Sequence, residues 1–386
     1  MERKGSVHRW VAAAAAIVVP FFVGCGDFFP PINNGGGGGG GGTTSGRVYV
    51  ANQAASSIGG FSIGTATLTI VTNTPVATSY KPLSMVATPN NSLLYVGSAV
   101  GIFVYFINSN GSLTTPTNGF QPAGVFAQSL AVSPDGQWLV ALDGTTQQLD
   151  IFQINSSTGA LTSVTSPATY SATSGIWQPT EVRFSPDGTL IFAALGTAGD
   201  VVFTFNTTTG VVPDSRQYLP TGDKATGDYG LVMSAKTPYL YIARSGTNGG
   251  VAVYNVTSGG VLTAVTGSPF AAGSGTFSVA LDSTGTYVYA ANRADGTVSG
   301  YTIVPATTAL GLSLTPLTGS PYLSGKGAQA IGIDATNKYL LSVAVGGAPD
   351  MTMYSFDIPV PGKLDPATSV ATGVNPAGAV ALALTH

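Results

Sequence analysis

The stretch SLAVSPDGQWLVA, residues 129–141, places two short apolar runs on either side of a Ser-Pro-Asp-Gly turn. Pro134 presets φ at the second position of the turn, and Gly136 can adopt the left-handed conformation that closes it. Short apolar runs that flank such a turn are typical of two β-strands joined in a hairpin. The stretch therefore predicts the first two strands of an antiparallel sheet.

The same pattern recurs along the chain. A second Ser-Pro-Asp-Gly turn at 185–188 precedes the apolar run 190–193, and weaker copies of the turn lie near positions 89, 235, 283 and 335. Successive turns are about 45–52 residues apart, which is the length of one four-stranded propeller blade. A third strand, such as 149–154, and a short fourth strand, such as 160–162, complete each repeat.

The two ends of the repeat region complement one another. The region opens with a second-strand sequence, Arg47–Asn52, and closes with a first-strand sequence, Ala379–Leu384. Pairing these two strands completes a seventh blade and removes the exposed sheet edges that invite aggregation. The sequence therefore predicts an all-β, seven-bladed β-propeller of four-stranded antiparallel blades over residues 46–386.

The turns and strands resemble a known family. The Ser-Pro-Asp-Gly turns, together with the strands YVAN at 49–52 and YAAN at 289–292, are similar to those of the seven-bladed lactonase family. That family includes 6-phosphogluconolactonases and shades into YVTN-repeat surface proteins. The resemblance covers residues 46–386, and it implies a propeller fold and hydrolysis of sugar-acid lactones.

The residues that the resemblance implies for catalysis are largely missing. The family's enzymes typically carry a histidine just before the turns at the channel mouth, and a glutamate after one of the second strands. The matching stretches here are Phe126-Ala127-Gln128-Ser129 and Gln178-Pro179-Thr180-Glu181, and the two histidines of the chain are His8 and His386. This departure leaves the fold inference intact and favours a binding or interaction module over a lactonase.

The first residues resemble a bacterial export signal. A basic start (Arg3, Lys4 and Arg9) precedes an apolar stretch at 11–22, and Phe22-Val23-Gly24-Cys25 resembles a lipobox. We expect residues 1–24 to be a lipoprotein signal peptide and Cys25 to be the lipidated residue. The alternatives are a signal cut elsewhere or an ordinary buried thiol. Cys25 is the single cysteine of the chain, so no intramolecular disulfide can form.

A glycine run follows the predicted lipidation site. Residues 35–42 are all glycine, so no side chain there can pack, and residues 25–45 are expected to form a flexible tether. These features predict an extracytoplasmic protein, anchored by lipid in a bacterial cell envelope. Gly26, where aspartate would favour inner-membrane retention, points to the outer membrane.

Composition excludes several kinds of partner and cofactor. Charged residues make up 8% of the chain, against about 25% in an average soluble protein, and the net charge is −3. No basic stripe is present, so we expect no nucleic-acid partner and no membrane contact beyond the lipid anchor. No Cys/His set for zinc, EF-hand loop or phosphate-binding loop occurs, so no metal or cofactor is expected. We expect a monomer.

One blade carries charges where the others do not. Aligning the first strands on their turns gives one column of Ser84, Ser129, Glu181, Gly230, Ser278, Ala330 and Gly378, and a second of Val86, Ala131, Arg183, Val232, Ala280, Gly332 and Val380. Side chains two apart on a strand share a face, so Glu181 and Arg183 can meet in the central channel. The pair either grips an anionic or hydroxylated ligand, with Glu181 as acid or base, or bridges two blades as an ion pair.

Strand direction predicts which loops gather at the channel mouth. The loops before first strands and after second strands share one face, and their polar and aromatic residues are Asn52, Lys81, Gln128, Asp143, Trp177, Gln178, Asp228, Tyr229, Arg244, Phe277, Asn292, Arg293, Lys326, Gln329 and Asn375. An aromatic ring flanked by amides and arginine suits a sugar or a sugar acid. The ligand-binding candidates are Arg183, Arg244, Arg293, Trp177, Gln128 and Asn292.

Two functions from different classes remain open. The first is a non-catalytic, lipid-anchored module whose rim binds a small sugar-acid or lactone ligand or a surface protein partner. The second is a lactone hydrolase in which Glu181 or Asp143 activates water, while Arg183, Arg244 or Arg293 holds the carboxylate or phosphate of the substrate.

Overall fold

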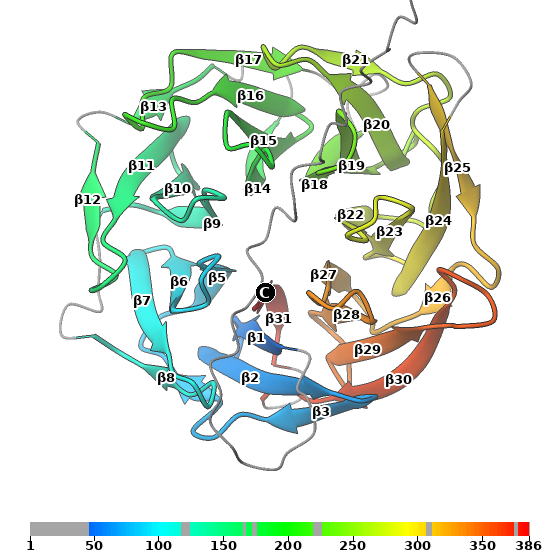
Figure 1. Cartoon of the computed structure of the whole chain (residues 1–386), viewed down its shortest axis with the longest axis horizontal. Helices are drawn as coiled ribbons and strands as arrows, with labels where there is room; N and C mark the ends of the chain where they lie inside the picture. The colour runs from blue at the N-terminus through cyan, green and yellow to red at the C-terminus, as the bar shows by residue number, and fades with distance from the viewer. Residues whose placement is uncertain are drawn as a thin grey trace, which may run out of the picture. The chain divides into compact units, whose positions relative to one another are not determined.

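The computed structural model describes residues 46–116, 124–164, 167–171, 176–218, 226–305, 311–373 and 377–385. These residues form β-strands that stand in seven blades around a central axis (Figure 1). Within these residues, no helix occurs that is long and apolar enough to cross a membrane. Residues 1–45, with the predicted signal peptide, Cys25 and the tether, lie outside the described residues, as do Asn375 and His386.

Each blade has its first strand nearest the axis. Blades 1 to 3 contain β5 (Pro82–Ala87), β6 (Leu93–Ser98), β7 (Gly101–Ile107) and β8 (Leu113–Thr114); β9 (Ala127–Val132), β10 (Trp138–Asp143), β11 (Gln148–Ile154), β12 (Leu161–Ser163) and β13 (Ala168–Thr169); and β14 (Trp177–Phe184), β15 (Leu190–Gly196), β16 (Asp200–Thr204) and β17 (Asp214–Tyr218).

Blades 4 to 6 follow the same order along the chain. They contain β18 (Gly227–Met233), β19 (Tyr239–Ser245), β20 (Gly250–Val256) and β21 (Leu262–Ala264); β22 (Thr276–Leu281), β23 (Tyr287–Asn292), β24 (Thr297–Pro305), β25 (Leu312–Pro316) and β26 (Tyr322–Leu323); and β27 (Ala328–Ile333), β28 (Tyr339–Ala344), β29 (Met351–Phe356) and β30 (Leu364–Val370).

Blade 7 is built from both ends of the described chain. Its strands are β31 (Ala379–Leu384), β1 (Arg47–Asn52), β2 (Ser57–Gly64), β3 (Thr67–Ile70) and β4 (Val76–Ala77). β31 pairs with β1 in antiparallel register from Val48–Leu384 to Asn52–Ala379. The predicted pairing of the terminal strands is therefore confirmed, with the bounds that the sequence indicated.

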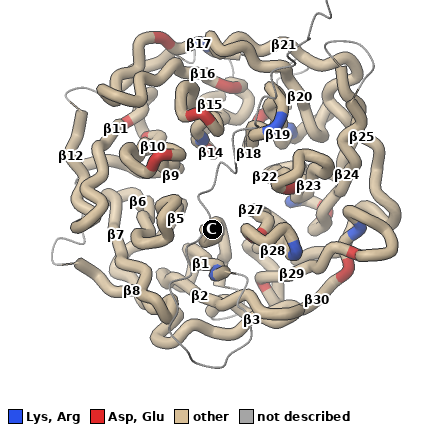
Figure 2. The backbone as a smooth tube through the Cα atoms, viewed as in Figure 1, with Lys and Arg blue, Asp and Glu red and all other residues tan. Residues whose placement is uncertain are grey.

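The core lies between the blades. The described residues contain seven clusters of buried apolar side chains, and each cluster joins one blade to its neighbour, blade 7 to blade 1 included. Because the second strands are nearly all buried, both of their faces are apolar, which explains runs such as Leu139-Val140-Ala141. Figure 2 shows how few charged residues the ring contains.

Tyrosines of the second strands add hydrogen bonds between blades. The hydroxyls of Tyr49, Tyr95 and Tyr289 donate to the carbonyls of glycines in the next blade at 2.6, 3.0 and 2.6 Å. The acceptors are Gly111, Gly159 and Gly362, all with φ between 72° and 86°. Left-handed backbone at these turns favours glycine, so in these three pairs of blades the turn glycine and the tyrosine of the preceding blade act as one unit.

Two features depart from seven identical blades. A single pair, Gly196 with Asp228, links β15 to β18, so blades 3 and 4 share one continuous sheet. The sequence alignment of the seventh first strand is also wrong by three residues. Ala381 pairs with Ala51 as Ser278 pairs with Ala291, so Ala381, and not Gly378, belongs to the column of Glu181. β31 has no turn after it on which to align the strand.

Candidate functional site

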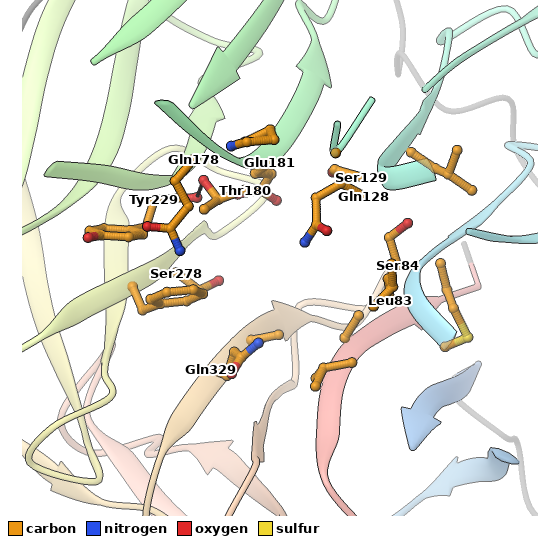
Figure 3. Close-up of a pocket in the computed structure, with 18 of the residues that line it drawn as sticks. Leu83, Ser84, Gln128, Ser129, Gln178, Thr180, Glu181, Tyr229, Ser278 and Gln329 are labelled. Carbon is orange, nitrogen blue, oxygen red and sulfur yellow. Dashed lines mark hydrogen bonds between the residues drawn. The ribbon is translucent and has the colours of Figure 1, made fainter. Parts of the chain in front are cut away.

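A cavity of about 440 Å³ occupies one end of the central channel. All seven first strands contribute to its wall (Figure 3). Its lining includes the predicted rim residues Gln128, Trp177, Gln178, Tyr229, Phe277, Arg293 and Gln329. The cavity has the size of small-molecule sites, and it brings together the aromatic and amide side chains that the sequence placed at the channel mouth.

β-Bulges turn a ring of side chains toward this cavity. In six of the seven first strands one extra residue interrupts the pairing with the second strand, and in β14 a longer interruption does so. The residues that fall at these interruptions and line the cavity are Leu83, Gln128, Gln178, Pro179, Thr180, Tyr229, Phe277, Gln329 and Val380. A bulge redirects a side chain that regular alternation would place elsewhere. The bulges therefore determine which side chains surround the mouth of the cavity.

One side of the mouth is an aromatic stack. The rings of Tyr229 and Phe277, from neighbouring blades, lie 5.1 Å apart at an interplanar angle of 24°. The guanidinium carbon of Arg293 lies 5.0 Å from the centre of the Phe277 ring. Figure 3 shows Gln178 beside Tyr229, with Gln128 and Gln329 projecting from other sides of the channel. These aromatic, amide and guanidinium groups, which the sequence placed at the channel mouth, therefore lie together.

Trp177 lies at the edge of the same cavity. Its indole N–H donates to the Tyr170 hydroxyl at 3.1 Å, and its backbone pairs with Gly196 at the link between blades 3 and 4. The hydrogen bond holds the indole against blade 3, so Trp177 contributes an apolar wall to the cavity.

Glu181 and Arg183 meet, as their spacing on one strand predicted, and form an ion pair. Arg183 Nη2 lies 2.5 Å from Glu181 Oε1, and Arg183 Nε donates to the same oxygen at 2.7 Å. The other carboxylate oxygen, Oε2, accepts the backbone N–H of Leu231 in blade 4 at 2.8 Å. Both oxygens of the carboxylate therefore have partners within the protein.

The column of Glu181 joins blades in other places too. Ser129 Oγ accepts the N–H of Val182 in the next blade at 3.1 Å, and Ser278 Oγ accepts that of Ile331 at 3.4 Å. Glu181 thus makes the interblade bond that serines make elsewhere. The ion pair itself stays within β14, and the carboxylate, through a backbone N–H, makes the link between blades 3 and 4.

The prediction that Asp143 lies on the rim, where it could activate water, is wrong. Asp143 is 5% exposed, and its oxygens accept the backbone N–H groups of Thr145, Thr146 and Phe126 and the Thr145 hydroxyl. Burial raises the pKa of Asp143, but the hydrogen bonds from Thr145 and Thr146 outweigh it and lower that pKa. The carboxylate closes the loop after β10, and it does not line the cavity.

The prediction that Arg244 lies at the channel mouth is also wrong. Its guanidinium is buried and pairs with Asp228, through Nε to Oδ1 at 2.6 Å and Nη2 to Oδ2 at 2.8 Å. Nη2 also donates to the Tyr254 hydroxyl at 3.0 Å. Asp200 is buried beside this pair, and burial and the charge of Asp228 hold the pKa of Asp200 well above its ordinary value. This buried cluster, Asp200, Asp228, Arg244 and Tyr254, lies away from the cavity wall.

Asn292 is buried as well, and the prediction that it contacts a ligand at the rim is not supported by its position. Its amide donates to the hydroxyls of Thr297 at 3.0 Å and Ser299 at 2.9 Å. Asn52 occupies the matching place in blade 7 and bonds to Thr372. The last residues of second strands pair with residues just before the bulges, and their side chains turn into the protein. Lys81 and Lys326 are exposed but do not line the cavity.

Comparisons with known proteins agree with the fold. Residues 114–227 match the family described as Lactonase, 7-bladed beta-propeller. The 6-phosphogluconolactonase-like protein of Bacteroides uniformis is 16% identical with a TM-score of 0.68, over 88% of this chain and 99% of that one. The corresponding protein of Bacteroides fragilis is 17% identical with a TM-score of 0.66, over 88% and 98%.

A third structural relative acts outside the cytoplasm. The periplasmic gluconolactonase of Pseudomonas aeruginosa is 17% identical with a TM-score of 0.63, over 88% of this chain and 99% of that one. No curated protein matches this chain by sequence. The predicted resemblance to lactonase-type propellers is confirmed by these matches, which at such identities establish the fold.

The site offers recognition chemistry more readily than acid–base chemistry. The ionisable side chains that line the cavity, apart from Tyr229, are Glu181, Arg183 and Arg293. Two of these three neutralise each other. No group of three or more potential metal ligands of the His, Cys, Asp or Glu type occurs in the part of the chain that the structure describes.

Proposed function

We propose that the chain is a non-catalytic binding module whose channel mouth takes a polyhydroxylated small molecule, a sugar or a sugar acid. The stack of Tyr229 and Phe277, rimmed by Gln128, Gln178 and Gln329, is the observation that carries this proposal. A pyranose ring or polyol chain presents C–H groups to an aromatic face and hydroxyls to amides at its edge. Because the two rings are already stacked on one another, little side-chain entropy is lost in ordering them when a ligand binds.

The occupied carboxylates support a role without catalysis. A carboxylate whose two oxygens already accept hydrogen bonds is less available to take a proton from water. Glu181 has both oxygens engaged, and Asp143 is closed within its own loop. The second candidate function, lactone hydrolysis, is favoured by the family match over residues 114–227 and by the lactonases among the structural relatives.

One experiment separates the two functions. The protein and its Glu181→Gln variant are assayed for hydrolysis of 6-phosphogluconolactone and glucono-δ-lactone, and binding of gluconate and glucose is measured by calorimetry. We expect no turnover above the spontaneous rate, together with saturable binding that Tyr229→Ala and Phe277→Ala abolish. Turnover that disappears in Glu181→Gln would establish the hydrolase instead.

We further propose that the module is exported and held at the cell envelope by lipid on Cys25. The basic start, apolar stretch and lipobox-like sequence before Cys25 support this, as does the glycine run at 35–42. Expression in a bacterial host with an alkyne-labelled fatty acid provides the test. We expect the label on the wild-type chain and none on Cys25→Ser, and equal labelling of both would refute the anchor.

A further inference from the structure

The charges of the cavity point to the class of ligand. Glu181 and Arg183 lie 2.5 Å apart and cancel, so the cavity wall carries the single uncompensated charge of Arg293. Arg293 is exposed, and no acidic side chain lies within ion-pair distance of it among the residues described. A net positive site attracts an anion and gains little from a neutral molecule.

The geometry of Arg293 fixes how an anion can approach. Its guanidinium lies over Phe277, at 5.0 Å from the ring centre, and its backbone N–H donates to Gly275. No hydrogen bond or ion pair of the guanidinium occurs among the described residues, so its N–H groups are available to a ligand. Those groups fit the two oxygens of a carboxylate in a bidentate arrangement. Because the ring already orients the guanidinium, less side-chain entropy is lost when an anion binds.

Amide side chains in the wall favour hydroxyl groups on the ligand. Gln128, Gln178 and Gln329 all line the cavity. Gln329 belongs to blade 6, next to the blade that carries Arg293, and both line the cavity. Amide groups can both donate hydrogen bonds to ligand hydroxyls and accept hydrogen bonds from them. The cavity wall therefore favours a ligand that carries both an anionic group and hydroxyl groups.

From these observations we propose that the site selects the open, ionised form of a polyhydroxy acid over its neutral lactone and over neutral sugars, with Arg293 as the residue that confers this selectivity. The inference rests on the proposed binding function and specifies its ligand class. A lactone has lost the carboxylate and one hydroxyl by cyclisation, with release of water, so it keeps hydroxyls for the amides of the wall but offers no anionic group to Arg293. The protein would then respond to the product of lactone hydrolysis.

The test compares ligands that differ only in charge. Binding of D-gluconate and of D-gluconamide, which has the same chain without the negative charge, is measured by calorimetry at low ionic strength. We expect gluconate to bind about tenfold more tightly, which corresponds to about 1.4 kcal/mol. The preference should shrink in 0.5 M salt, because an exposed ion pair is screened.

Variants assign the preference to one residue. Arg293→Gln should bring the two affinities together by weakening gluconate alone, and Arg293→Lys should restore part of the preference because it keeps the charge and loses the fork. Lys326→Gln, which removes an exposed cation outside the cavity wall, is the matched control and should leave the ratio unchanged.

The outcomes distinguish this inference from the proposed function. Equal binding of gluconate and gluconamide, or a loss of both in Arg293→Gln, overturns the selectivity while the binding module stands. Absence of binding by every polyol, or lactone turnover by the wild type, overturns the proposed function itself. A preference for gluconate that Arg293→Gln removes and Lys326→Gln retains supports the inference.

Discussion

Replacement of Arg244 by glutamine tests the buried cluster between blades 3 and 4. The guanidinium makes two bonds, of 2.6 and 2.8 Å, to Asp228, and both residues are at most 1% exposed. Glutamine removes the positive charge and leaves Asp228 buried, with Asp200 beside it. Breaking a buried ion pair from one side costs about 3–5 kcal/mol, so Arg244→Gln should lower the free energy of unfolding by about that amount at pH 7.

The loss should depend on pH with a defined sign. An isolated buried carboxylate is penalised in its charged form only, so protonation relieves the penalty. Unfolded aspartate titrates near pH 4, and the variant should therefore lose least stability in acid and progressively more as the pH rises above that value. The double variant Asp228→Asn/Arg244→Gln carries no buried charge from the pair and should recover most of the loss.

Urea unfolding followed by tryptophan fluorescence at pH 4.5 and pH 7.5 measures these effects. Arg183→Gln is the matched control, because the Arg183 side chain is 54% exposed and its ion pair should contribute at most about 1 kcal/mol. The reasoning is refuted if Arg244→Gln unfolds within 1 kcal/mol of wild type at pH 7.5, or if its loss is the same at both pH values.

Three further predictions follow from the closure, the cluster and the interblade bonds. Deletion of the residues after Gly378 removes β31 and should leave an insoluble or rapidly proteolysed protein, whereas a truncation as heat-stable as the full chain would contradict closure. Because the pKa of Asp200 is raised in the folded protein, the free energy of unfolding should fall as the pH rises from the ordinary aspartate pKa through the pKa of folded Asp200. Asp200→Asn should remove this loss, and the midpoint of urea unfolding should then depend less on pH. Glu181→Gln keeps an acceptor for the Leu231 N–H and should cost under about 1 kcal/mol, while Glu181→Ala leaves that N–H unbonded and should cost about 1–3 kcal/mol in the same unfolding assay.

The sequence predicted the fold well because the fold repeats. The turn at 133–136 recurs with enough regularity to count blades, and the two terminal strands could be recognised because each lacked its partner. Alignment failed only at β31, where no turn follows the strand. The repeat therefore allows each blade to be aligned on the others by its turn, and this guide is missing for β31.

The site was harder to predict because it depends on departures from regularity. Simple alternation does not reveal the bulges, so the ring that includes Leu83 and Val380 was not foreseen as a unit. The same bulges bury the ends of the second strands, which turned Asp143 and Arg244 from expected ligand contacts into structural residues. The sequence also does not show which charged residues form an ion pair. Arg244 pairs with Asp228, which lies 16 residues earlier in the chain.

The direction of β1 decides at which end of the ring the chain enters the propeller. β1 begins at Arg47 beside Leu384 and Thr385, at the end of the ring where the Ser-Pro-Asp-Gly turns lie, and it runs toward Asn52 and the cavity end. A chain that enters the ring at Gly46 therefore holds the propeller by the face opposite the cavity. With lipid on Cys25 as proposed, the tether would join the ring away from the mouth, so solutes could reach the cavity without passing the point of attachment.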